Sequence, residues 1–371
     1  MKFKAKIKRI LEGLPKKVKI GKRYMGEGQP VFVVAEIGIN HNGSFELAKR
    51  LIKEAKLAKA DAVKFQKRNP EEILIKEWLE RPYNSPNAYG RTYGEHRKKL
   101  ELSGEEYYKL KKYADDLGIL FFASVWDFSS ADFMEKLGVA AYKIPSADVI
   151  NLPLLEYVAK KDRPILLSTG MSTLEEIDEA VKVILKYNSR LIIFHCVSFY
   201  PCPDDKIDLN FMNILKQRYK PLPIGYSGHE IGYLPTLTAV AMGTPIVERH
   251  FTLNKKMKGS DHAASLEPKE LKELIEKIKT VEKIRGEAKK IIYEELKPIR
   301  EKLAKSIVSK KDIPKGTVIT EEMFSIKGPG SGIKPSLIRE VIGRVAQVDI
   351  EKDKLIPSEA LNWPRAPWWK R

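Results

Sequence analysis

Short apolar runs alternate with amphipathic stretches of helical period between residues 31 and 250. The runs have the length and the β-branched and aromatic content of buried strands. Stretches 44–60 and 103–118 each start with a serine that predicts a helix N-cap. Eight strand–helix units in roughly 250 residues predict an α/β fold, a (β/α)8 TIM barrel. The eight predicted strands are residues 31–36, 62–66, 119–124, 141–145, 164–168, 191–196, 223–227 and 245–250.

The pattern changes after the barrel. Residues 287–302 are a charged stretch with helical spacing, and residues 304–363 combine short strand-like pieces with many turn formers. A chain of 371 residues also exceeds the size at which a single core usually divides. We therefore expect a basic N-terminal extension (1–24), a barrel (25–286), a linker (287–303), a small loop-rich domain (304–363) and a C-terminal tail (364–371).

Composition narrows the class of protein. With 43% hydrophobic residues, no apolar stretch of bilayer length and no secretory signal pattern, we expect a globular, cytoplasmic protein without a membrane partner. The formal charge of +18 is dispersed, since lysines accompany glutamates as in residues 267–290, and no nucleic-acid-binding motif occurs. We expect no nucleic-acid partner, although the positive field would attract small phosphorylated anions. Cys196 and Cys202 are expected to be free thiols without a catalytic role.

Polar residues stand at the ends of all eight predicted strands, where barrel enzymes have their active sites. His229 and His250 close the last two, and neutral imidazole is the commonest protein ligand for divalent transition metals. A single histidine at a strand end is more often a hydrogen-bonding group than a metal ligand. Polar residues recur at all eight strand ends, however, and this favours a pocket that binds metal and phosphate. The other polar residues there are Glu36, Asn40, His41, Lys64, Gln66, Ser124, Lys143, Ser146, Asp148, Ser168, Thr169, His195, Ser198, Tyr200, Ser227 and Glu248.

Several segments resemble the signatures of a known family, the sialic acid synthases, and residues 305–363 resemble the antifreeze-like (SAF) domain of those enzymes. The resemblance implies condensation of phosphoenolpyruvate with an N-acylated hexosamine and water, giving a nine-carbon 2-keto acid and phosphate. Residues 80–103 are more similar to the animal-type branch, whose acceptor is N-acetylmannosamine 6-phosphate, than to the bacterial branch. The segments are AEIGINHNG (35–43), VKFQK (63–67), GYSGHE (225–230), ERHFTL (248–253) and KGSDHAASLEP (258–268).

The resemblance also implies roles for single residues. His229 and His250 match the metal ligands, with Mn²⁺ or Mg²⁺ as the expected ion, and Glu36, Lys64 and Glu248 are expected beside them in catalysis. The residues expected to hold phosphoenolpyruvate are Lys64, Ser124, Lys143, Ser146, Ser168, Ser198 and Ser227. Those expected to position the hexosamine and handle protons are Glu36, Gln66, Asp148, Tyr200 and Asp261.

Three departures from the family pattern stand out. Pro145 and Ala147 flank Ser146 where many relatives have glycines, and Ser198 stands where bacterial members often have asparagine. Gly328 occupies the position where bacterial members have an arginine that reaches the partner's active site, which leaves Lys327 as the expected substitute. Because the family's SAF domain caps the other subunit's barrel, a domain-swapped homodimer is implied.

Three alternatives are left open by the residues. In the first, the protein is a synthase whose acceptor is a deoxy-diacetamido hexose that leads to legionaminic or pseudaminic acids. In the second, it is a metal-dependent pyruvate aldolase. In the third, it is a carbohydrate-binding or structural protein built on an inactive barrel. Retention of both histidines with Glu36, Glu248 and Asp261 argues against an inactive barrel. Release of inorganic phosphate would distinguish the synthase from the other two classes.

Overall fold

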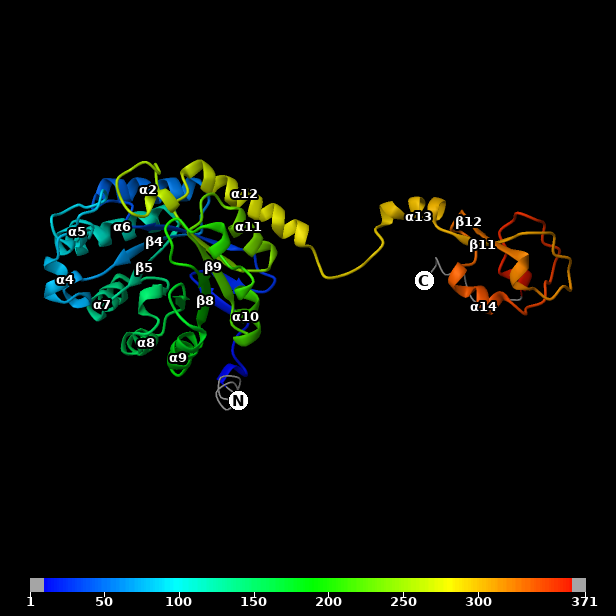
Figure 1. Cartoon of the computed structure of the whole chain (residues 1–371), viewed down its shortest axis with the longest axis horizontal. Coiled ribbons are helices and arrows are strands. Elements are labelled where there is room, and N and C mark those ends of the chain that lie inside the picture. The colour runs from blue at the N-terminus through cyan, green and yellow to red at the C-terminus, as the bar shows by residue number, and fades with distance from the viewer. Residues whose placement is uncertain (1–9, 362–371) are drawn as a thin grey trace. The chain divides into compact units, whose positions relative to one another are not determined.

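Eight parallel strands close into a barrel, as the sequence predicts (Figure 1). The computed structural model describes residues 10–361, so residues 1–9 of the expected extension and the expected tail lie outside the described part. Around the closed sheet the strand order is β10-β3-β4-β5-β6-β7-β8-β9. The strands are β3 (Phe32–Gly38), β4 (Ala62–Lys67), β5 (Leu120–Val125), β6 (Tyr142–Ile144), β7 (Ile165–Ser168), β8 (Leu191–Cys196), β9 (Ile224–Gly228) and β10 (Ile246–His250).

Amphipathic helices follow the strands and cover the outside of the barrel. Ser44 accepts a hydrogen bond from the Leu47 N–H, and Ser103 forms a capping box with Glu106, so two predicted helices begin at the expected serines. Short helices α3 (Pro70–Ile73), α4 (Lys76–Glu80) and α5 (Tyr93–Lys99) lie between β4 and α6. The main helices are α2 (Phe45–Leu57), α6 (Gly104–Leu117), α7 (Phe128–Leu137), α8 (Leu152–Ala159), α9 (Leu174–Leu185), α10 (Phe211–Arg218), α11 (Leu234–Ala241) and α12 (Pro268–Arg285).

Part of the expected N-terminal extension belongs to the barrel's hydrophobic core. Residues Lys17–Ile20 (β1) and Arg23–Gly26 (β2) form an antiparallel hairpin. Val18 and Ile20 are buried while Lys17 and Lys19 are exposed. This two-residue alternation is typical of a half-buried strand, so the lysines mark its solvent face rather than a separate basic arm.

Strand register brings polar residues from different strands side by side. A register shift between Glu36 and Gly38 on β3 is a local irregularity of the kind that redirects side chains at a barrel rim. The register pairs are Glu36 with Lys64 and His250, Ser124 with Gln66 and Lys143, and Ser227 with Glu248.

The chain divides into two compact units after Gly286. The second has its own small core, which includes Ile307, Ile319 and Val341. The prediction of a helix throughout 287–302 is wrong: residues 287–293 are not helical, because in this exposed stretch no apolar face is buried. The second unit contains α13 (Lys297–Leu303), the antiparallel strands β11 (Ser306–Ser309) and β12 (Phe324–Lys327), and α14 (Ile338–Val341). No helix among residues 10–361 is long and apolar enough to cross a membrane.

Candidate active site

A cavity of about 280 Å³, open to solvent, lies at the carboxyl ends of the barrel strands. Its position matches the face where barrel enzymes have their active sites. All but two of the residues expected to bind metal or substrates line it. They are Glu36, Lys64, Gln66, Ser124, Lys143, Ser146, Ser168, Ser198, Tyr200, Ser227, His229, Glu248, His250 and Asp261.

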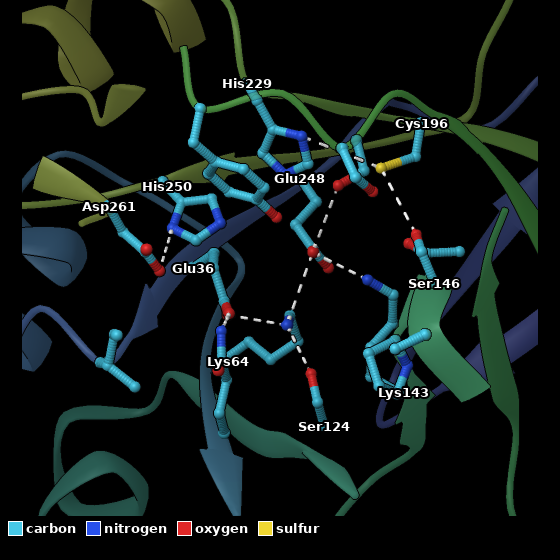
Figure 2. Close-up of a pocket in the computed structure, with 18 of the residues that line it drawn as sticks. Glu36, Lys64, Ser124, Lys143, Ser146, Cys196, His229, Glu248, His250 and Asp261 are labelled. Atoms are coloured by element: carbon cyan, nitrogen blue, oxygen red, sulfur yellow. Dashed lines mark hydrogen bonds and ion pairs between the residues drawn. The ribbon is translucent and has the colours of Figure 1, made fainter. Parts of the chain in front are cut away.

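Two lysines and two glutamates form a buried ionic network at the bottom of this pocket. Lys64 Nζ lies 2.8 Å from Glu36 Oε2 and 3.5 Å from Glu248 Oε1. Lys143 Nζ lies 2.8 Å from the same Glu248 oxygen. Figure 2 shows Glu248 contacting both lysines and Glu36 beside Lys64. Each of the four side chains is at most 5% exposed, so the charges interact with little screening by water.

The two carboxylates differ in how strongly the lysines stabilise their charge. Burial raises the pKa of Glu36 to about 7, because Lys64 offsets only part of the effect and Glu248 adds to it. Burial acts on Glu248 too, but Lys143 and Lys64 outweigh it and hold its pKa at about 2. Glu248 is therefore the permanent anion, and Glu36 is able to exchange a proton near neutral pH.

His229 and His250 lie together at one side of the pocket. Their ring centroids are 5.3 Å apart, and the Tyr200 ring packs on both, with its centroid 4.0 Å from that of His229. His229 Nδ1 lies 2.7 Å from the Val197 carbonyl oxygen, so when it donates there, Nε2 is left to accept. His250 Nδ1 is buried, has no hydrogen-bond partner among residues 10–361, and lies 3.6 Å from Asp261 Oδ2.

The donor set fits a divalent metal with two protein ligands. Burial, then the His229 charge, holds the pKa of His250 well below its usual range, so this ring is neutral. For His229, burial lowers the pKa but the neighbouring Cys196 reverses the direction, and a metal would compete with that proton. Among residues 10–361 no group of three or more His, Cys, Asp or Glu side chains is arranged to hold a metal, so other ligands must complete the shell.

Small side chains leave room for an anion beside the lysines. Ser124 Oγ accepts from Lys64 Nζ at 2.8 Å, and Ser146 Oγ accepts from the Gly170 N–H at 2.9 Å. A Cβ at Gly170 would lie 2.5 Å from Ser198 Oγ, so a side chain there would displace the pocket wall. Ser168 Oγ is buried and has no hydrogen-bond partner in the described chain. Hydroxyls of this kind serve as phosphate or carboxylate donors.

Of the two remaining expected site residues, Asp148 does not line the pocket, and Lys327 belongs to the second unit. Asp148 ends a short 3-10 turn, Ser146–Asp148, and accepts from Asn151 Nδ2 at 3.1 Å. Burial raises its pKa to about 6. Lys327 lies on β12 in the second unit, exposed and paired with Asp353. Pro145 and Ala147, which depart from the family pattern, do line the pocket.

Three polar residues at the strand ends have structural partners instead. His195 Nε2 lies 2.7 Å from the Ile207 carbonyl oxygen, and Thr169 donates to the Phe194 carbonyl oxygen at 2.8 Å. Asn40 donates to the Phe251 carbonyl oxygen at 2.9 Å and to Ser265 Oγ. None of the three lines the pocket, because side chains alternate between the two faces of a strand and loop residues turn away from it.

Sequence reasoning gave no site role to several pocket residues, including Cys196, Arg68, Arg97 and Trp126. Cys196 is a free thiol, as expected, but its sulfur lies 3.9 Å from His229 Nδ1 and 3.8 Å from Ser146 Oγ. Its place at the end of a predicted strand would have identified it. Arg68, Arg97 and Trp126 also line the pocket. Arg97 belongs to α5, which lies outside the strand-helix repeat, so strand-end reasoning contains no signal for it.

Comparisons with family models and known proteins agree with this geometry. The NeuB family model matches residues 51–290, and the SAF domain model matches residues 304–361. The chain is 39% identical to the N-acetylneuraminate-9-phosphate synthase of Homo sapiens, over 92% of this chain and 95% of that protein. It is 38% identical to the N,N'-diacetyllegionaminic acid synthase of Legionella pneumophila, over 86% and 91%.

A solved structure gives the same result. The crystal structure of N-acetylneuraminic acid (sialic acid) synthetase from Leptospira borgpetersenii, in complex with citrate, superposes with a TM-score of 0.69 and 34% sequence identity. The match covers 78% of this chain and 96% of that one. The similarity therefore extends over nearly the whole length of these relatives.

Proposed function

The chain belongs to the NeuB family of phosphoenolpyruvate-dependent nonulosonic acid synthases, and we propose that it condenses phosphoenolpyruvate with N-acetylmannosamine or its 6-phosphate. The observation that supports this most is the buried network of Lys64, Lys143, Glu36 and Glu248 beside the pair His229 and His250, in one pocket. Two cations and several hydroxyls suit the two anionic groups of phosphoenolpyruvate.

In the proposed reaction, C3 of phosphoenolpyruvate forms a bond to the aldehyde carbon of the open-chain sugar, and the aldehyde oxygen takes up a proton. Water adds at C2, and the C–O bond to the phosphate breaks. The products are a nine-carbon 2-keto acid and inorganic phosphate. Carbon–oxygen cleavage of phosphoenolpyruvate makes phosphate release an obligatory signature of this chemistry.

The chain's own residues position both substrates for this step. Lys64 and Lys143 would hold the phosphate and carboxylate, with Ser124, Ser146, Ser168, Ser198 and Ser227 as further donors. Gln66 donates to Glu36 Oε1 at 3.2 Å, so these two side chains form a joint surface for the acceptor. Glu36, which also contacts Lys64, is the group placed to move the proton at the aldehyde oxygen.

NeuB enzymes are generally metal-dependent, and His229 and His250 would hold Mn²⁺ or Mg²⁺ here. The ion would supply Lewis-acid polarisation of the aldehyde carbonyl. Asp261, next to His250 Nδ1, would orient that ring as an outer partner. Tyr200, packed on both histidines, would face the sugar, and a role for Asp148 there would require movement of its turn.

A second acceptor is favoured by one observation. Identity to the legionaminic acid synthase of Legionella pneumophila, at 38%, nearly equals that to the human 9-phosphate synthase, at 39%. A deoxy-diacetamido hexose is therefore the second candidate. We further propose a homodimer in which the SAF domain of each subunit caps the partner's barrel, with Lys327 contributing to the partner's site.

The test is release of inorganic phosphate from phosphoenolpyruvate with Mn²⁺, measured with each of the three sugars and with EDTA. Release that requires both a sugar and the metal supports the synthase and identifies the acceptor. Pyruvate replacing phosphoenolpyruvate would instead indicate an aldolase. Absence of release with every sugar, in a folded metal-loaded protein, would contradict the proposed function.

A further inference from the structure

A second set of side chains that donate hydrogen bonds lines the pocket on the β4 and β5 side. The described part of the chain offers too few acceptors for their N–H groups. Arg68, two residues beyond Gln66, is 1% exposed and donates from Nε to Glu101 Oε1 at 2.7 Å. Its Nη2 is buried with no hydrogen-bond partner among residues 10–361. Trp126 Nε1, after β5, is buried and equally unpartnered in the described chain, and the Arg68 guanidinium lies 5.4 Å from its ring centroid.

Arg97 adds a second guanidinium to this set. It comes from α5 and donates from Nε to the neutral Tyr93 hydroxyl at 2.8 Å. Within the described part of the chain no carboxylate forms an ion pair with it. Burial lowers the pKa of Arg97 and the Arg68 charge lowers it further, which reflects two like charges held close together. The two guanidinium groups therefore repel each other, and a bound anion would reduce this repulsion.

The contrast with the lysines shows why this set needs a ligand. Lys64 and Lys143 are each paired with a buried glutamate. Arg68 shares its only carboxylate, Glu101, with Lys67, and Arg97 has none within ion-pair distance in residues 10–361. Native proteins leave few buried donors unsatisfied, because each costs free energy comparable to a lost hydrogen bond. Two such donors on one pocket wall, next to a guanidinium that no carboxylate of residues 10–361 pairs with, favour an anionic ligand as the acceptor.

The set lies beside the residues assigned to the acceptor sugar. Gln66 precedes Arg68 at the end of β4, and Asp261 interacts electrostatically with Arg97. All four side chains line the same cavity. An anion held here would thus belong to the acceptor, while phosphoenolpyruvate occupies the lysine and serine side.

We propose that Arg68, Arg97 and Trp126 form a subsite for a phosphomonoester on the acceptor, so that the substrate is an N-acylated hexosamine phosphate. This rests on the proposed function for the identity of the sugar. A phosphomonoester carries a charge of about −1.5 to −2 at neutral pH, which matches two guanidinium groups. A single carboxylate on the ligand would neutralise the charge of only one of the two guanidinium groups. Arginine also binds phosphate in a bidentate manner, and the indole N–H supplies a third donor.

The test compares N-acetylmannosamine 6-phosphate with N-acetylmannosamine. Binding to the Mn²⁺-loaded protein is measured by calorimetry without phosphoenolpyruvate, and kcat/KM is measured by phosphate release. We expect the wild type to prefer the phosphorylated sugar by about 100-fold or more. Arg97→Met should lower this preference about 10- to 100-fold, and Trp126→Phe, which keeps an aromatic ring but removes the indole N–H, about tenfold.

Lys98→Met is the matched control, since Lys98 is on the same helix but pairs with Glu71 outside the pocket. It should leave the preference unchanged. The proposal is overturned if the wild type binds both sugars equally, or if Arg97→Met raises the KM for phosphoenolpyruvate and leaves the sugar preference intact. A binding preference without turnover of either sugar would support the subsite while contradicting the condensation reaction.

Discussion

Lys64 is shared between two carboxylates, and this arrangement sets the chemistry of individual residues in the pocket. Glu248 forms ion pairs with both Lys64 and Lys143, whereas Glu36 forms one with Lys64, which it shares with Glu248. A bound dianion would draw both lysines toward it and weaken their hold on the glutamates. The glutamates therefore compensate the charges of the two lysines until an anionic substrate binds to the lysines.

Lys64→Ala should mainly impair the use of phosphoenolpyruvate. Loss of a charge-assisted contact predicts a fall of about 100-fold in kcat/KM for this substrate. Phosphate release at varied phosphoenolpyruvate concentration measures the effect, and a melting curve checks the fold. An unchanged dependence on phosphoenolpyruvate in a folded variant would exclude Lys64 from the site.

His250→Ala should abolish Mn²⁺ binding and reduce activity by about three orders of magnitude, because Lewis-acid polarisation contributes several kcal/mol. The barrel should remain folded, since its core lies elsewhere. Calorimetry with Mn²⁺ measures the binding. His195→Gln is the control: His195 is buried outside the pocket, so this variant should still bind the metal. Full activity of His250→Ala would contradict the metal assignment.

His41 is predicted to make the folded protein less stable at acidic pH. Burial, then Arg68, lowers its pKa from 6.5 to about 3 in the folded protein. Below pH 6.5 the unfolded chain therefore binds a proton that the folded chain does not, and stability falls as the pH falls toward 3. At pH 5 the loss is about 2 kcal/mol. His41→Gln should lose less stability than the wild type between pH 7 and pH 5 in urea unfolding; equal losses would refute the assignment.

At the scale of elements, a buried ion pair fixes the loop that carries His229. Arg249 on β10 contacts Glu230 Oε1 at 2.8 Å and donates to the carbonyl oxygens of Gly228, Glu230 and Gly232. Both side chains are fully buried. The link between β10 and the residues after β9 thus holds His229 and His250 at a constant spacing.

Arg249→Met should destabilise the barrel by about 3–5 kcal/mol, because it leaves Glu230 as an uncompensated buried charge. The double variant Arg249→Met with Glu230→Gln should recover part of the loss, since that charge is then absent. Urea unfolding of the three proteins measures the difference. A double variant as unstable as Arg249→Met would show that the lost hydrogen bonds, rather than the stranded charge, dominate.

At the scale of the whole molecule, the barrel and the SAF unit have separate cores and are joined through exposed residues 287–293. Such a connection allows the SAF unit to serve a partner subunit. Each unit has its own cluster of buried hydrophobic residues. The proposed exchange between subunits is therefore compatible with how each unit is stabilised.

Complementation tests the exchange. His250→Ala inactivates a barrel, and Lys327→Ala should impair the SAF contribution. When the two variants are produced together, a swapped dimer contains one site with both wild-type residues, so activity should exceed that of either variant alone. No gain in purified heterodimers would contradict the swap, and full activity of Lys327→Ala alone would remove Lys327 from the site.

The amino-acid pattern is enough to predict the barrel and most of the pocket. Apolar runs of strand length, separated by capped helices, specify all eight strands, and polar residues at the strand ends must meet because parallel strands share one carboxyl face. Residues 17–24 of the hairpin fall within the expected basic extension (1–24), because solvent-facing lysines obscure the alternating buried residues Val18 and Ile20 in the sequence.

Which side chains lack partners and which charges are shared depends on the folded arrangement of the chain. Asp148 and Glu36 are both acidic residues near strand ends, yet only Glu36 faces the lysines. The cluster of Arg68, Arg97 and Trp126 joins three separate segments, and its unsatisfied donors become evident only when every neighbour is placed. Hydrogen bonding and desolvation depend on distances between residues remote in sequence, and no local pattern encodes these distances.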